Sequence, residues 1–165
     1  MWTDRLYPID EAKLGVVLDT LSRRASHARE ALRILQALRR SDLVGRVFDR
    51  RCEAAARQAL PGYSVHYYLS ECNRRRGRCL IVTREAPNGS RQKWNFSLAY
   101  ADDPRLTLER LDACIDYQRK ELQRYTAAAA DFPSLVAQYN SACDYMRVIC
   151  SGLERILLLG DPTYR

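Results

Sequence analysis

The stretch YSVHYYLSECNRRRGRCLIVTREAPNGSRQKWNFSLAY, residues 63–100, decides the fold predicted for this chain. Segments typical of strands lie at 63–70, 78–84 and 93–100. The first and third alternate in polarity, with Tyr63, Val65, Tyr67 and Leu69 on one face of the first, and Trp94, Phe96, Leu98 and Tyr100 on one face of the third. Such alternation of aromatic and branched residues predicts half-buried antiparallel strands.

Two turns are predicted between these strands. Residues 73–77, Asn-Arg-Arg-Arg-Gly, supply the first turn, and Pro87-Asn88-Gly89 supply the second. Proline presets a negative φ and glycine accepts a positive one, as tight turns require. The stretch therefore predicts a three-stranded antiparallel meander.

Helices are predicted on both sides of the meander. The first covers about 10–40, and the second runs from an N-cap at Ser41 over about 42–60. A third begins near Asp103-Pro104, and a fourth follows a break near Asp131, starts at Pro133 and stops at Gly160.

The predicted apolar stripes support these helices. They consist of Leu14, Leu18, Leu21, Ala25, Ala28, Leu32 and Leu35 in the first helix, and Tyr139, Cys143, Met146, Cys150, Leu153 and Leu157 in the fourth. Steps of three and four residues are typical of packed helices and of coiled coils. We expect an α+β fold: an antiparallel bundle of about four helices, with the three-stranded meander inserted between its two halves. Pairing of the first helix with a second copy as a coiled-coil dimer is the alternative.

The length of 165 residues predicts one domain over 1–165, with helical halves at 1–62 and 101–165 around the basic meander at 63–100. The first residues lack the order of a secretory signal, and no apolar run approaches the length of a membrane span. We therefore expect a cytoplasmic protein with reduced cysteines, no membrane contact, no metal and no cofactor.

The meander carries most of the excess positive charge. It holds seven basic residues, Arg74, Arg75, Arg76, Arg78, Arg84, Arg91 and Lys93, against two acidic ones, which gives +5 of the chain's +7. These seven residues are the predicted nucleic-acid-binding site, because guanidinium groups contact phosphates and nearby aromatic rings can stack on bases. The turns lie at opposite ends of the middle strand, roughly 20 Å apart, so the charge forms two patches.

Other interpretations of this charge stay open. Charged strand ends also prevent foreign strands from pairing with a sheet, and 24 arginines against 3 lysines are typical of a GC-rich genome. A lowered thiol pKa at Cys72, beside the arginines, would make that cysteine reactive. The first helix offers a further basic ridge of Arg29, Arg33 and Arg40.

We expect a non-enzymatic binding protein, because the chain shows no phosphate-binding loop, nucleophile elbow or zinc-protease motif. The first hypothesis is an accessory or regulatory protein that contacts DNA or RNA through the Arg-rich meander. The second is a helical-bundle adaptor or a homodimeric protein–protein interaction module. The sequence does not distinguish DNA from RNA or name the partner.

Overall fold

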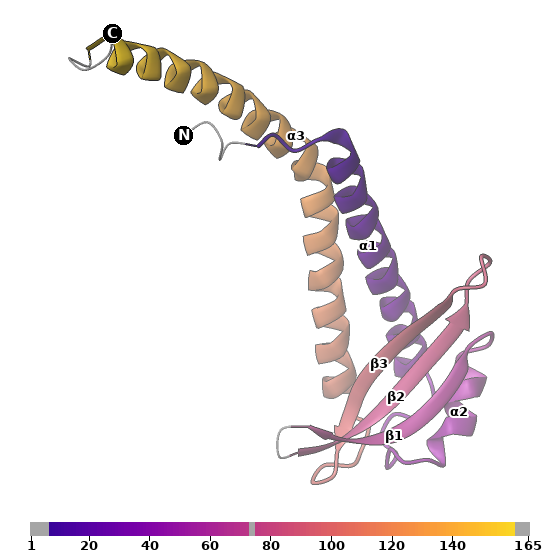
Figure 1. Ribbon diagram of the computed structural model, residues 1–165. Coiled ribbons are helices and arrows are strands. Elements are labelled where there is room, and N and C mark those ends of the chain that lie inside the picture. Colours follow the sequence, from indigo (N-terminus) through magenta and orange to yellow (C-terminus); the bar gives the residue numbers. More distant parts are fainter. Residues whose placement is uncertain (1–6, 73–74, 161–165) are drawn as a thin grey trace. The chain divides into compact units, whose positions relative to one another are not determined.

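The computed structural model describes residues 7–72 and 75–160, apart from the side chains of four of them (72, 75, 158 and 160). It has three helices and three strands in the order α1 (Glu11–Arg39), α2 (Cys52–Ala59), β1 (Ser64–Cys72), β2 (Arg75–Glu85), β3 (Arg91–Tyr100) and α3 (Leu108–Gly160) (Figure 1). The two long helices, α1 and α3, pack against each other, and the three strands lie between them in the sequence. The predicted α+β class and the inserted antiparallel sheet are confirmed.

The chain divides into two compact units. One unit comprises Ala25–Gln123, and the other comprises Met1–Arg24 together with Arg124–Arg165. The expected single domain over 1–165 stays a prediction. None of the helices in the described part of the chain is long and apolar enough to cross a membrane, and the cytoplasmic location also stays a prediction.

The sheet is the predicted meander, in the order β1-β2-β3 with both pairs antiparallel. Gly89 has a φ of 77° and donates its N–H to the carbonyl of Ala86, which forms the predicted second turn. β1 continues to Cys72 and β2 begins at Arg75, so residues 75–77 of the first predicted turn belong to β2, and residues 73 and 74 lie outside the described residues. The cross-strand pair of Glu71 and Arg76 favours this longer ladder, since opposite charges face each other across it.

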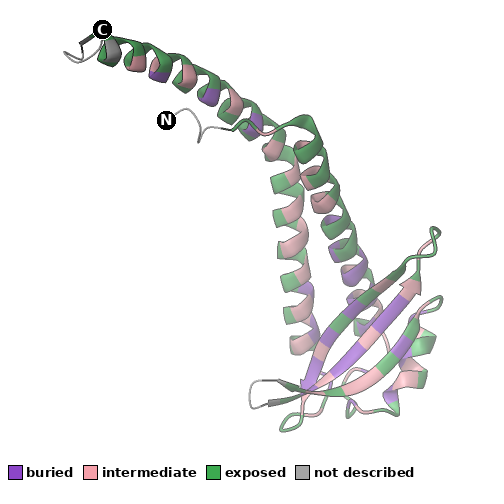
Figure 2. Ribbon diagram, viewed as in Figure 1, coloured by how far each residue is buried: buried purple, intermediate pink, exposed green. Residues whose placement is uncertain are grey.

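The core of the unit Ala25–Gln123 lies between the inner face of the sheet and the helices. Inner-face residues Val65, Leu80, Val82, Trp94 and Phe96 join Ile34, Leu35 and Leu38 of α1 and Leu111 and Ile115 of α3 in one buried cluster. Buried residues recur along each strand, as Figure 2 shows for the central ribbon of the sheet. The alternation in the sequence therefore identified the buried residues Trp94, Phe96 and Leu98 of β3 and Val65 of β1, whereas the prediction is wrong for Leu69, which is 51% exposed.

The buried face of α1 differs from the predicted stripe. Ala31, Ile34 and Leu38 are almost fully buried, whereas Leu32 is only half-buried. The helix also buries Glu30, at 9% exposure, so its sheet-facing side is wider than one heptad seam. A helix that packs on a sheet and on a second helix covers two directions, and a single stripe does not describe it.

The predicted second helix over 42–60 is wrong except for its last part, α2. Before α2, Gly45 has a φ of 85°, and its N–H donates to the carbonyl of Leu106. Phe48 is fully buried, and its N–H donates to the carbonyl of Pro104. The segment therefore exchanges helical hydrogen bonds for bonds to the chain that precedes α3, and Gly45 permits the left-handed turn.

The predicted break near Asp131 is also wrong, because α3 runs continuously through Pro133. A proline inside a helix removes one hydrogen bond and costs about 3 kcal/mol, which the helical alanines of 127–130 help to offset. The helix begins at Leu108, later than predicted, because the Thr107 hydroxyl accepts the N–H of Arg110 as an N-cap. Over residues 7–72 and 75–160, three helices replace the expected four.

In the other unit, α1 begins at an N-cap, where the Asp10 carboxylate accepts the N–H of Lys13 at 2.7 Å. The preceding segment is tied to α3 through Asn140. Its side-chain amide accepts the N–H of Ile9 and donates to the carbonyl of Ile9, both at 2.8 Å. Arg24 of α1 lies over the ring of Tyr125 at 5.9 Å. These contacts pair the start of α1 with the middle of α3.

Candidate nucleic-acid interface

The sheet separates the predicted basic residues onto different faces. Arg78 and Arg84 lie on the inner face of β2, the same face as Leu80 and Val82. The exposed Arg91 and Lys93 lie on the outer face of β3. Arg76 lies near the hairpin end. Arg74 lies outside the described residues, and Arg75 is placed in β2 by its backbone alone.

Arg78 is tied to the protein interior. One guanidinium nitrogen donates to the carbonyl of Phe48 at 2.9 Å and to the Tyr67 hydroxyl at 3.4 Å. Its Nε is buried and has no hydrogen-bond partner within the described part of the chain. This arginine therefore holds β2 to the segment before α2, and its charge is directed into the fold.

Arg84 belongs to a polar cluster around the buried carboxylate of Glu30. Its guanidinium donates to Glu30 Oε1 at 3.0 Å and to the Tyr63 hydroxyl at 3.3 Å. The Tyr63 hydroxyl donates to the same carboxylate oxygen, and Arg33 reaches Oε2 at 3.3 Å. Buried charges are stable only when they are paired and hydrogen-bonded, so Arg84 balances Glu30.

This cluster predicts a pH dependence of stability. Burial, followed by the hydrogen bond to Glu30 and its negative charge, raises the pKa of Tyr63 from 10.0 to about 12. Because the pKa is higher in the folded state, the stabilisation is present below pH 10 and is lost as the pH rises towards 12. The free energy of unfolding of Tyr63→Phe, measured in urea, should depend less on pH between pH 10 and 12 than that of the wild type. An unchanged dependence would contradict the prediction, and the exposed Tyr117→Phe serves as control.

The outer face of the sheet carries a groove with a volume of about 430 Å³. It is lined by Ser64, His66, Ile81, Thr83, Arg91 and Lys93, and it borders Val65, whose side chain belongs to the buried core. Arg91 and Lys93 are exposed, and the Arg91 guanidinium donates to the Thr83 hydroxyl at 3.3 Å. No carboxylate among the described residues forms an ion pair with Arg91 or Lys93. The groove therefore combines two available cations with hydroxyl groups.

An aromatic side chain adjoins this groove on the same face. Tyr68 lies on β1 two residues beyond His66, and its hydroxyl accepts the side-chain N–H of Asn95 at 2.7 Å. Two carboxylates limit the positive potential. Glu53 of α2 lies 3.4 Å from Nδ1 of His66, and Glu85 faces Arg91 across the end of the β2–β3 ladder.

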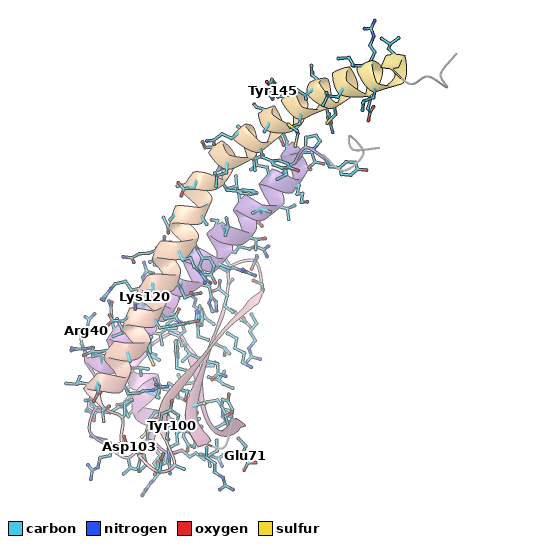
Figure 3. All side chains as sticks on the ribbon, turned by 90° about the vertical axis from the view of Figure 1, so that its left-hand side faces the viewer. Arg40, Glu71, Tyr100, Asp103, Lys120 and Tyr145 are labelled. Atoms are coloured by element: carbon cyan, nitrogen blue, oxygen red, sulfur yellow. The ribbon has the colours of Figure 1, made fainter. Side chains whose placement is uncertain are left out.

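The hairpin end of β1 and β2 is a second charged region. Arg76 pairs with Glu71 at 3.3 Å, and both side chains are largely exposed. Figure 3 labels Glu71 at this end of the sheet, away from the α3 segment that carries Lys120. An exposed ion pair is weak, so Arg76 can exchange Glu71 for another anion at little cost.

Sequence reasoning missed the partners that make this face a site. His66, Tyr68 and Thr83 join Lys93 because the strands are antiparallel and in register, with Ser64 opposite Thr83 and Thr83 opposite Lys93. Period-two alternation applied to 78–84 would have separated Arg78 and Arg84 from the outer face. His27 of α1 is bound to β3, where its Nε2 donates to the carbonyl of Lys93 at 2.9 Å.

The described residues provide no geometric support for a metal site or for a reactive thiol at Cys72. Among the residues that the structure describes, His, Cys, Asp and Glu side chains form no group of three that could hold a metal ion. The side chain of Cys72, the predicted reactive thiol, lies outside the described set. No protein-family model, no curated protein and no solved structure matches this chain.

Proposed function

We propose that this is a non-enzymatic, accessory or regulatory protein that binds single-stranded nucleic acid on the outer face of its sheet. The observation that carries the proposal is the groove over β1, β2 and β3, which Arg91, Lys93 and His66 line together. Tyr68 lies two residues beyond His66 on β1. Single-strand binders combine a cationic groove that follows the phosphates with aromatic rings that accept bases. An open sheet face suits a splayed strand better than a duplex, whose bases are stacked inside.

The proposed interface contains five of the seven basic residues that the sequence predicts as the nucleic-acid-binding site. Arg91 and Lys93 contact phosphates in the groove, and the hairpin arginines Arg74, Arg75 and Arg76 form a second contact. Arg78 and Arg84 are assigned to the fold, because their guanidinium groups bind Phe48 and Glu30. The two contacts lie roughly 20 Å apart, so only a long strand reaches both.

The double variant Arg91→Ala/Lys93→Ala should bind labelled single-stranded DNA or RNA at least about tenfold more weakly at low salt. Each lost phosphate contact should also reduce the slope of log K against log salt by about 0.7. Fluorescence anisotropy with oligothymidine and oligouridine measures both quantities. Arg50→Ala/Lys120→Ala removes the same charge from exposed positions elsewhere and should leave affinity and slope close to wild type.

Strand length tests the hairpin contact in the same assay. Arg74→Ala/Arg75→Ala/Arg76→Ala should weaken binding of strands of about twenty nucleotides and leave binding of about six nucleotides unchanged, because short strands occupy one site. Wild-type protein that binds no single strand at ~50 mM salt would reject the proposal. Equal losses in the Arg50→Ala/Lys120→Ala control would show that net charge alone causes binding.

A further inference from the structure

The second half of α3 exposes apolar side chains on a helix with few neighbours. Leu153, Ile156, Leu157 and Leu159 are all exposed, and Leu157 is 71% exposed. Tyr145, which Figure 3 labels on this half of α3, is 67% exposed. Contiguous exposed apolar surface of this kind marks an interaction site.

The apolar residues repeat as a heptad. Tyr139, Met146 and Leu153 occupy position d and are exposed. Cys143, Cys150 and Leu157 occupy position a; the two cysteines are buried and Leu157 is exposed, so the exposed part of the seam consists of the d residues and Leu157. The g positions are apolar as well, with Ala142, Ile149 and Ile156. An a/d seam of this length, widened by the g positions, is suited to pairing with another helix.

The charges on this segment are few and balanced. Between residues 139 and 159 the chain has two acidic residues, Asp144 and Glu154, and two basic residues, Arg147 and Arg155. Arg147 and Glu154 occupy successive e positions, one heptad apart, beside the apolar seam. A surface with equal numbers of both signs, placed on one edge, can complement a second copy of itself.

We propose that this face of α3 binds a second copy of the chain in an antiparallel helix pair centred near Cys150. In an antiparallel pair, e positions face e positions, so Arg147 of each copy meets Glu154 of the other. In a parallel pair, e positions face g positions, and both charges would lie against Ala142 and Ile149 instead. Charged e and g positions set the orientation of coiled coils. The pairing is independent of the proposed nucleic-acid site.

Analytical ultracentrifugation tests the pairing. The full chain should show a mass that rises with concentration from 19.0 kDa towards twice that value. Leu157→Glu should weaken self-association by more than about tenfold, because an apolar contact is replaced by a buried charge. Val148→Glu is the matched control, since Val148 is 72% exposed, lies nine residues away on the opposite face and should associate as the wild type does.

Charge reversal tests the antiparallel orientation. Arg147→Glu and Glu154→Arg should each weaken association, because each places like charges together in the pair. The double variant Arg147→Glu/Glu154→Arg should restore association. The two residues are about 10 Å apart along one helix, so restoration requires contact between copies. The ion pair of Arg147 with Asp144 is lost in both Arg147 variants and does not explain a rescue.

Several results would overturn the proposal. A wild-type protein that keeps the monomer mass at all concentrations would do so, as would equal weakening by Val148→Glu. Circular dichroism should show the same helix content in all variants, so that loss of association is not loss of folding. Binding to lipid vesicles that Leu157→Glu abolishes, in a protein that stays monomeric, would identify a membrane surface as the occupant instead.

Discussion

Replacing Trp94 with alanine is expected to lower the free energy of unfolding by about 3–5 kcal/mol. The side chain is 2% exposed, and its Nε1 donates to the carbonyl of His27 in α1 at 3.0 Å. The His27 ring stacks on the indole with centroids 5.1 Å apart, and Tyr63 meets the indole edge-on at 6.1 Å. The change removes the largest buried side chain together with a link between the sheet and α1.

Urea unfolding followed by circular dichroism measures this loss. A domain with the usual stability of about 5–15 kcal/mol would be brought close to unfolding. Trp94→Phe keeps most of the apolar surface and should cost less, since it removes the hydrogen bond and part of the ring. Lys93→Ala, the neighbour on the outer face, should change stability by less than about 0.5 kcal/mol. An alanine variant as stable as wild type would show that Trp94 lies outside the core.

The position of Trp94 was readable from the sequence. Alternation in 93–100 placed Trp94, Phe96 and Leu98 on the buried face, because a strand with one solvated face enforces a period of two. The turn at Gly89 was readable for a similarly local reason. These features depend on neighbours within a few residues, which the sequence shows directly.

The errors arose where distant segments decide the local structure. The segment around Gly45 and Phe48 resembles a helix in composition, but its backbone bonds to Pro104 and Leu106, almost sixty residues away. Pro133 resembles a helix start, yet the helix continues through it, because one missing hydrogen bond does not outweigh the turns on both sides. Local signals compete with such long-range terms and do not reveal them.

The sequence indicated the candidate site only through the net charge of residues 63–100. The pairing of the strands decides which of these basic residues lie on the outer face. Total charge treats Arg84 and Lys93 alike, whereas the sheet places one beside Glu30 and the other in the outer groove. Glu30 lies 54 residues before Arg84, so no spacing rule links the two. His66 lies in the groove because β1 pairs with β2. The basic residues taken alone do not reveal this strand pairing.

The assignment of Arg84 to the fold leads to the second large effect. Arg84→Met should lower the free energy of unfolding by about 1–3 kcal/mol, because the buried Glu30 loses a direct partner. The value is discounted since the Arg84 side chain is 38% exposed. Arg91→Met removes the same charge from the outer face and should cost less than about 0.5 kcal/mol in urea unfolding.

A double-mutant cycle isolates the pair. Glu30→Gln removes the charge that Arg84 balances, so the variant Glu30→Gln/Arg84→Met should be more stable than the sum of the single losses predicts, by about 1 kcal/mol or more. Additive losses would show that Arg84 acts through its stacking on Tyr63 and Trp94, at 5.3 and 5.9 Å, and not through Glu30.

Binding by the same variant separates the two roles of arginine in this sheet. Folded Arg84→Met protein should bind single strands with wild-type affinity and salt slope, because its guanidinium faces Glu30 and Tyr63. Arg91→Met should bind single strands more weakly than the wild type and should keep the wild-type free energy of unfolding. A loss of affinity without a loss of stability in Arg84→Met would return Arg84 to the interface. That result would mean that the charge sum of the meander, rather than the outer groove, describes the binding surface.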